Sequence, residues 1–460
     1  MTNDDICALV DDASLRGEVP AVELVEALLE RVDRSQPRLH ALITVTAELA
    51  LDDARRVDRH RGSGDRLALD GMPMVVKDNI DVAGAPTTVG SRLFAGRAPD
   101  ADAEVTGRLR AAGAVILGKA NMHELAFGAT SRNETFGHVL NPAAPDRIPG
   151  GSSGGSGAAV AADLCVAAIG TDTGGSIRLP ASLCGVSGLR PTYGAVSNRG
   201  VQPVSWSLDT VGPLARAVTD VRAVLEVIAG FDPGDPYSAD VRLDVSGADA
   251  VDGLRVGVVE ALLDESDPDV AACVRELGSA LVELGATLSP IDLPGAEQAV
   301  DACGHLIKSE ALAVYREALA SRPEHFEEGT RRRLELSAGL SASDLALIHD
   351  ELHRWMRTTR LVLDEVDLLL LPTSPVEAPF AAGADTVETS AAVAPYTHLL
   401  SLARVPSLSL PCGVTRSGAP VGAMIAAAWW RDGLVLRAGA AIQSVTDWHR
   451  SRPQQDASII

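Results

Sequence analysis

Lysine is scarce in this chain of 460 residues. Lysine and arginine together number 40, yet only Lys77, Lys119 and Lys308 are lysines. Arginine stays protonated at any ordinary pH, whereas burial can neutralise a lysine, which can then act as a base. Lysine therefore stands where arginine would not serve, and Lys77 is a candidate catalytic base.

Positive charge as a whole is in short supply. The chain carries 62 acidic residues against 40 basic ones, which gives a formal charge of −22 at pH 7. Such a balance repels phosphate backbones and anionic membrane surfaces. Nucleic acid and membranes are therefore not expected among the partners.

Long apolar runs and closely paired cysteines are also missing. No run reaches the roughly 18 apolar residues of a membrane span, and residues 1–12 lack the basic region and apolar stretch of a secretory signal. The six scattered cysteines indicate reduced core residues, so we expect a cytoplasmic location. The hydrophobic content of 46% suits one large α/β domain or two to three smaller ones.

Short apolar runs alternate with helical patterns along the chain. Strand-like runs lie at residues 72–76, 114–117, 166–169, 254–259, 367–371, 405–410 and 421–427. Helical patterns lie at residues 22–32, 41–61, 270–284, 309–320 and 342–366. This rhythm is typical of an α/β sheet protein, with the later strands returning to the same sheet after a connection at 231–246.

Two glycine-rich segments, GGSSGGSG at 150–157 and GTDTGGSIR at 170–178, predict a site lined by backbone. A flexible linker is disfavoured because an apolar run, residues 158–169, separates them. A nucleophile elbow is matched around Ser152 and around Ser153, but a proline-rich loop precedes them where an elbow needs a strand. No later histidine stands in a recognisable setting for a Ser-His-Asp triad.

The two segments, together with GMPMVVKDN at 71–79 and LCGVSGLRPTYG at 183–194, resemble the amidase signature family of serine hydrolases. The resemblance is strong over residues 60–230. It implies a single large α/β domain, with a twisted mixed β-sheet core surrounded by α-helices. Within this single domain, residues 1–460, we expect N-terminal helices over 1–62 and the catalytic motifs over 63–230. Residues 231–460 would complete the sheet and the substrate cleft.

The resemblance also implies three catalytic residues. Ser176 would be the nucleophile, Ser152 the bridging serine after a cis peptide bond from Gly151, and Lys77 the base that takes the proton through Ser152. A serine hydroxyl is a weak nucleophile until a base accepts its proton. Lysine serves near neutral pH only if burial or nearby positive charge lowers its pKa.

Six further residues surround these three. The family's oxyanion hole maps onto the backbone N–H groups of Thr173, Gly174 and Gly175, where donors stabilise developing negative charge. Supporting roles rather than chemical ones are expected for Ser153, Asp172 and Arg178. Specificity is expected to come from residues 300–400.

The expected reaction is amide hydrolysis through a serine acyl-enzyme, which releases ammonia or an amine and requires no metal or organic cofactor. The expected partner is a small-molecule amide or a urea derivative related to biuret or allophanate, and the enzyme would be a monomer or a homodimer. The alternative is the glutaminase subunit of a tRNA-dependent amidotransferase. Residues 305–319 lack that subunit's Ser-Asn-Leu-Ala-Arg-Tyr-Asp-Gly-like stretch, and Met424 replaces the glutamine of the family's closing motif.

Two weaker patterns point elsewhere. GAVILGKA at 113–120 nearly spells a phosphate-binding loop, but Ala120 stands where serine or threonine is needed, which leaves Lys119 a structural role. His349 and His353 have zinc-ligand spacing without a third ligand, so a solvated or packed helix face is the better interpretation. His123 is expected near the cleft.

Overall fold

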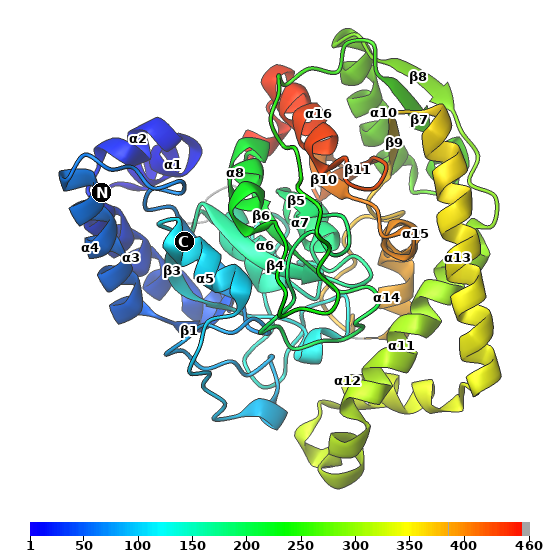
Figure 1. Cartoon of the computed structure of the whole chain (residues 1–460), viewed down its shortest axis with the longest axis horizontal. Coiled ribbons are helices and arrows are strands. Elements are labelled where there is room, and N and C mark those ends of the chain that lie inside the picture. The colour runs from blue at the N-terminus through cyan, green and yellow to red at the C-terminus, as the bar shows by residue number, and fades with distance from the viewer. Residues whose placement is uncertain (385, 453–460) are drawn as a thin grey trace.

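Eleven strands form one mixed sheet in the computed structural model, which describes residues 1–384 and 386–452 (Figure 1). In spatial order they are β1 (Leu42–Val45), β3 (Val115–Ala120), β2 (Pro73–Lys77), β4 (Ala167–Asp172), β6 (Thr210–Ala215), β5 (Ser187–Arg190), β10 (Ser407–Val414), β11 (Pro420–Ala426), β9 (Leu368–Pro372), β7 (Arg255–Val258) and β8 (Thr287–Pro290). The predicted late strands do return to the sheet that the early strands begin. The α/β fold class, with one large mixed sheet, is confirmed.

Helices cover the sheet and both of its ends. They are α1 (Asn3–Asp11), α2 (Ala13–Glu18), α3 (Ala21–Leu39), α4 (Ala47–Gly62), α5 (Glu104–Ala111), α6 (Gly154–Ala161), α7 (Arg178–Cys184), α8 (Val218–Ile228), α9 (Glu260–Asp264), α10 (Pro268–Glu283), α11 (Ala296–Ser321), α12 (Glu328–Leu336), α13 (Ala342–Glu365), α14 (Val387–Val393), α15 (Pro395–Ala403) and α16 (Asp432–Val445). In Figure 1 the N-terminal helices lie at the left and α11–α13 at the right, with β4, α6 and α7 between them. None of the helices in the described residues is both long and apolar enough to cross a membrane.

The prediction of a helix over residues 41–61 is wrong for its first residues. Residues Leu42–Val45 form β1, antiparallel to β3, and α4 begins only at Ala47. The β-branched run Ile43, Thr44 and Val45 suits a pleated surface better than a helix. Chain direction changes at His40, which ends α3 in the left-handed conformation.

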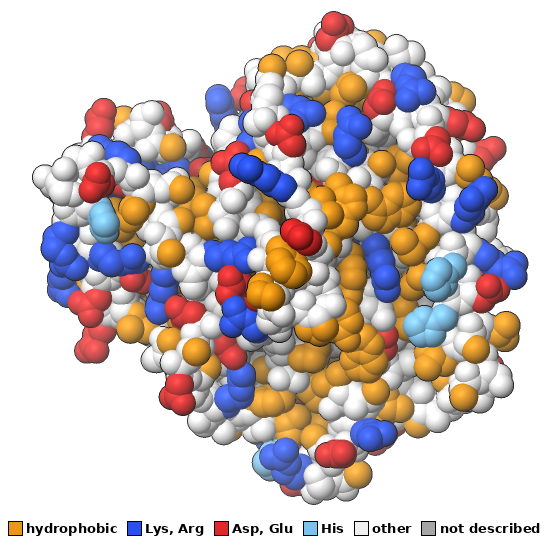
Figure 2. All heavy atoms as spheres, in the orientation of Figure 1, with side chains coloured by type: hydrophobic (Ala, Val, Ile, Leu, Met, Phe, Trp, Pro, Cys, Tyr) orange, Lys and Arg blue, Asp and Glu red, His pale blue; other side chains and the backbone are white. Residues whose placement is uncertain are grey.

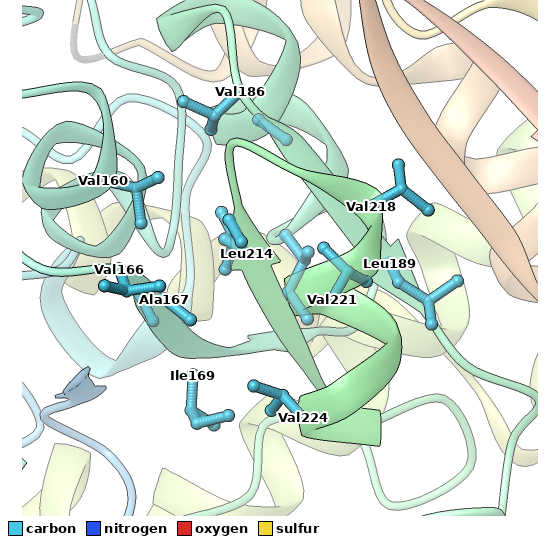
Figure 3. Packing of buried hydrophobic residues seen from close by; sticks show 14 of the residues in the cluster. Val160, Val166, Ala167, Ile169, Val186, Leu189, Leu214, Val218, Val221 and Val224 are labelled. Carbon is cyan, nitrogen blue, oxygen red and sulfur yellow. The ribbon is translucent and has the colours of Figure 1, made fainter. Parts of the chain in front are cut away.

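The core beneath the glycine-rich segments is made of small and branched apolar side chains. Ile169 on β4, Leu214 on β6 and Val221 on α8 are fully buried and pack together (Figure 3). Apolar burial of this kind is the main stabilising force in folding. It fixes β4, and therefore fixes the loop that leaves the end of β4 at Asp172.

Candidate active site

Lys77 is the last residue of β2 and is completely buried. Its Nζ donates hydrogen bonds to Ser152 Oγ at 2.7 Å and to Thr171 Oγ1 at 2.8 Å. Thr171 comes from β4, which runs parallel to β2 as its neighbour. Parallel strands end at the same edge of a sheet, which explains why two motifs almost a hundred residues apart meet here.

Burial decides the protonation of Lys77. It lowers the pKa of the lysine to about 7, even though the carboxylates of Asp172 and Asp209 act in the opposite direction. A large fraction of Lys77 is therefore neutral at physiological pH. The neutral amine of Lys77 can then accept a proton from the Ser152 hydroxyl that it contacts.

The loop that carries Ser152 is held by contacts to its own backbone. The Gly151–Ser152 peptide bond is cis. The Ser152 carbonyl accepts hydrogen bonds from the His123 N–H and from Ser131 Oγ, at 3.1 and 3.3 Å. A Cβ on Gly151 would lie 2.7 Å from backbone atoms of the facing segment, so glycine is required there.

Ser176 lies directly beside this loop. Its carbonyl oxygen accepts the Ser153 N–H at 3.2 Å, and Ser153 Oγ in turn donates to the Thr171 carbonyl at 3.2 Å. The Ser176 side chain faces a cavity of about 200 Å³, which Gly151 also lines. No hydrogen bond within the described residues occupies the Ser176 hydroxyl, so it is available to a ligand in the cavity.

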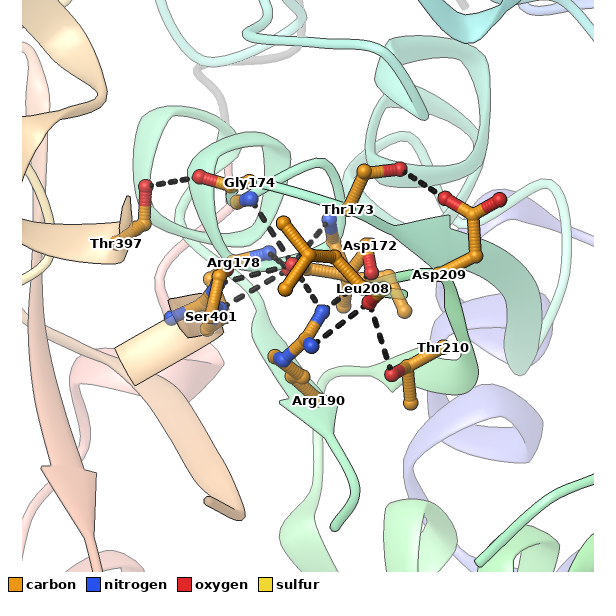
Figure 4. A network of polar contacts seen from close by, with 12 residues as sticks. Asp172, Thr173, Gly174, Arg178, Arg190, Leu208, Asp209, Thr210, Thr397 and Ser401 are labelled. Carbon is orange, nitrogen blue, oxygen red and sulfur yellow. Dashed lines mark hydrogen bonds and ion pairs between the residues drawn. The ribbon is translucent and has the colours of Figure 1, made fainter. Parts of the chain in front are cut away.

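Asp172 anchors the loop that leads to Ser176 (Figure 4). Its carboxylate accepts hydrogen bonds from Arg178 Nε at 3.0 Å, Arg190 Nη1 at 3.1 Å and the Gly175 N–H at 2.9 Å. Burial acts to raise the pKa of this carboxyl, but the guanidinium groups of Arg178 and Arg190 hold it well below its usual range. Asp172 is therefore a permanently charged structural centre.

Contacts on two further sides fix residues 173–174. Thr173 Oγ1 donates to Asp209 Oδ1 at 2.6 Å, and Thr397 Oγ1 on α15 donates to the Gly174 carbonyl at 2.6 Å (Figure 4). Because the Gly175 N–H is bound to Asp172, the loop's backbone donors without an acceptor among the described residues are the N–H groups of Thr173, Gly174 and Ser176. These three donors are preorganised beside the cavity.

The buried contacts of Asp172 should contribute to the free energy of unfolding. Asp172→Ala should lower the free energy of unfolding by about 3–5 kcal/mol, because two buried guanidinium groups lose their counter-charge. Urea unfolding followed by tryptophan fluorescence measures the change. The matched control is Asp350→Ala, which breaks an exposed 2.7 Å ion pair with Arg354 on α13 and should change stability little. Equal effects of the two substitutions would contradict the anchoring role.

The other sequence candidates occupy structural positions. Lys119 lies in β3 and pairs with Asp78 Oδ1 at 3.3 Å in a buried contact, so its segment, Val115–Ala120, forms a strand rather than a phosphate-binding loop. His349 and His353 lie one turn apart on α13, and the structure's described residues contain no cluster suited to a metal ion. Met424 is buried against Arg178, with Sδ 3.5 Å from Nη1, so the position supports the anchor rather than the cavity.

The far wall of the cavity comes from helices that carry no motif. His398 of α15, Lys308 of α11 and Arg333 of α12 line it together with apolar residues of α14. Burial, reinforced by Arg178, lowers the pKa of His398 to about 4, so this histidine is neutral. His123 lies behind the Ser152 loop, near Thr130 and Arg333.

A mixed sheet that holds a buried lysine against Ser152, next to a cavity lined by Ser176, suits an α/β enzyme of the serine hydrolase type. The chain belongs to the amidase family: the family model described as Amidase matches residues 23–436. Membership makes this an amide-hydrolysing enzyme of the amidase signature group.

Three similar proteins illustrate the range of this family. The A-type subunit of the glutamyl-tRNA(Gln) amidotransferase of Chloroflexus aggregans is 40% identical, with 95% of each chain covered. A solved protein of a vestigial complex that bears on the origins of an s-triazine catabolic enzyme is 31% identical, with TM-score 0.89 and coverage of 96% of this chain and 98% of its own. The peptide amidase of Stenotrophomonas maltophilia is 31% identical, with TM-score 0.82 and 96% of each chain covered.

Proposed function

We propose that this chain hydrolyses a small-molecule carboxamide through an acyl-enzyme on Ser176. The observation that carries the proposal is the 2.7 Å hydrogen bond from Lys77 Nζ to Ser152 Oγ, in a buried setting that lowers the pKa of the lysine to about 7. A base with a pKa near the working pH is the most effective proton acceptor. Ser176, on the adjacent cavity wall, is the hydroxyl that such a relay would activate.

Proton transfer in this proposal runs along one short path. Ser176 Oγ attacks the amide carbonyl while its proton passes to Ser152, whose own proton passes to Lys77 Nζ. The N–H groups of Thr173 and Gly174, and that of Ser176, donate to the carbonyl oxygen as it becomes negative; Gly175 shapes the loop, with its own N–H bound to Asp172. The proton then returns through Ser152 to the leaving nitrogen. In the second step water attacks the acyl-enzyme carbonyl, its proton passes through Ser152 to Lys77, and a proton returns to Ser176 Oγ as the ester bond breaks.

A second candidate is a glutaminase subunit that works with a protein partner. The 40% identity to the A-type subunit of an amidotransferase favours it. Structural likeness to a peptide amidase favours a stand-alone hydrolase, as does the missing subunit-like stretch at 305–319. Turnover of amides by the purified chain supports the stand-alone enzyme, and turnover only with a co-purified partner supports the glutaminase role.

The pH dependence of kcat/KM tests the proposed base. Because only neutral Lys77 accepts a proton, activity should rise tenfold per pH unit at low pH and level off above a pKa of about 7. Covalent labelling by a fluorophosphonate, which needs the same activated serine, should follow the same curve. A flat profile between pH 5.5 and 9 for both reactions would exclude Lys77 as the base.

A further inference from the structure

The cavity beside Ser176 has an unusual charge pattern. Most of its wall is apolar, including Phe127, Leu179 and Ile307, and its only charged side chains within the described part of the chain are Lys308 and Arg333. No aspartate or glutamate of the described residues lines it. In a chain of formal charge −22, a cavity whose charged side chains among the described residues are both positive favours a negatively charged ligand.

Helix α11 holds Lys308 in a fixed position. Gly304, Ile307 and Lys308 line the cavity, a spacing of three and four residues that puts them on one helix face. Ile307 packs against Gly174, since a Cβ there would lie 2.9 Å from the isoleucine Cδ1. Glu310 ties the same turn to the core by accepting hydrogen bonds from Ser205 Oγ and Ser207 Oγ, at 2.5 and 2.6 Å.

Arg333 and Lys308 differ in how many partners surround their charged groups. Arg333 Nη2 donates to the Thr386 carbonyl at 3.3 Å, its Nη1 lies 3.3 Å from His123 Nε2, and Glu388 is near enough to feel its charge. Lys308 is half-buried, and no described residue forms a hydrogen bond or ion pair with its ammonium. A charge beside apolar walls without a counter-ion is costly, so a ligand anion would be favoured there.

The groups that face Lys308 strengthen this contrast. His398 on α15 lies close enough for the charge of Lys308 to help lower its pKa, and a neutral imidazole is no counter-ion for the lysine. Arg333 on α12 adds charge of the same sign on the same wall. Glu310, two residues along α11, has its carboxylate engaged by Ser205 and Ser207.

We propose that the substrate is an amide that also carries a carboxylate, and that Lys308 binds this carboxylate while the amide carbonyl faces Ser176. The inference rests on the proposed function of Ser176. The cavity of about 200 Å³ lies below the roughly 300–1,000 Å³ of pockets for drug-sized ligands, which fits a short dicarboxylic monoamide. An ammonium–carboxylate hydrogen bond is among the stronger polar contacts, so Lys308 determines specificity without taking part in bond cleavage.

The test compares two amides of equal length, succinamate and butanamide. The wild-type kcat/KM should be about 10- to 100-fold higher for succinamate, the ratio expected for a hydrogen bond to a charged group. Lys308→Gln should bring this ratio close to one, whereas Lys308→Arg should retain much of it. Lys308→Glu should instead favour β-alaninamide, whose charge is positive. The matched control is Arg316→Gln, which removes a positive charge from an exposed site on α11 and should keep the wild-type ratio.

A second measurement needs no turnover. Succinate should slow fluorophosphonate labelling of Ser176 in the wild type and in Arg316→Gln, but not in Lys308→Gln. Absence of labelling in the wild type would overturn the proposed function itself. Normal labelling without protection by succinate, or with equal turnover of the two amides, would overturn only the carboxylate site.

Discussion

Ser176→Ala is expected to abolish amide hydrolysis, with a loss of roughly 10⁴- to 10⁶-fold in kcat, as for other serine nucleophiles. The residual rate would reflect only substrate binding and the backbone donors of Thr173, Gly174 and Ser176. Steady-state release of ammonia measures the loss. Mass spectrometry after fluorophosphonate treatment should show one adduct on the wild type and none on the variant.

Stability provides the internal check on this substitution. The Ser176 hydroxyl makes no hydrogen bond in the described residues and only part of the residue is exposed, so alanine should leave the melting temperature within a few degrees. Ser321→Ala, an exposed serine at the end of α11, is the control for loss of a hydroxyl. Wild-type turnover by Ser176→Ala would exclude Ser176 as the nucleophile.

The sequence indicated the three candidate catalytic residues because each of them lies in a local motif. Lys77, Ser152 and Ser176 each lie in a segment whose glycines are needed for close backbone approach. Such glycine-rich segments can be recognised from the sequence alone. The structure brings all three to one edge of the sheet. Their roles remain predictions that substitutions of Ser176 and Lys77 test.

The residues on the far wall of the cavity lie in no recognisable sequence motif. Lys308, Arg333 and His398 come from three helices, and their approach depends on packing between segments up to a hundred residues apart in sequence. On the face of the molecule that Figure 2 shows, a band of apolar side chains lies between the centre of the view and helices α11–α13. Apolar patterning predicts such helices but not which residue of each one meets a ligand.

Strand prediction failed where glycine and proline replaced branched residues. β5 and β6 include Gly188, Gly212 and Pro213, and were not anticipated, although both lie at the centre of the sheet. A Cβ at Gly188 would lie 2.7 Å from the Ala181 side chain, so helix α7 requires this glycine in order to approach the sheet. Tertiary packing thus overrides local β-propensity at these positions.

Lys77→Met should lower kcat by about 10²- to 10⁴-fold, the usual contribution of a general base. Methionine matches the length of lysine but accepts no proton, so the acid limb near pH 7 should disappear from the residual activity. Steady-state kinetics and fluorophosphonate labelling across pH 5.5–9 measure both effects. Lys77→Arg should be no better, because a guanidinium stays protonated throughout this range.

The control for Lys77 is the chain's other fully buried lysine. Lys119→Met leaves the buried Asp78 carboxylate without its ion pair, so it should cost about 3–5 kcal/mol of stability. The folded fraction should nevertheless keep the acid limb near pH 7, because Lys77 is intact. Retention of both kcat and the acid limb by Lys77→Met would refute the relay. Scarcity alone cannot separate the three lysines, but contact can: Lys77 bonds to a hydroxyl, Lys119 to a carboxylate, and Lys308 faces the cavity.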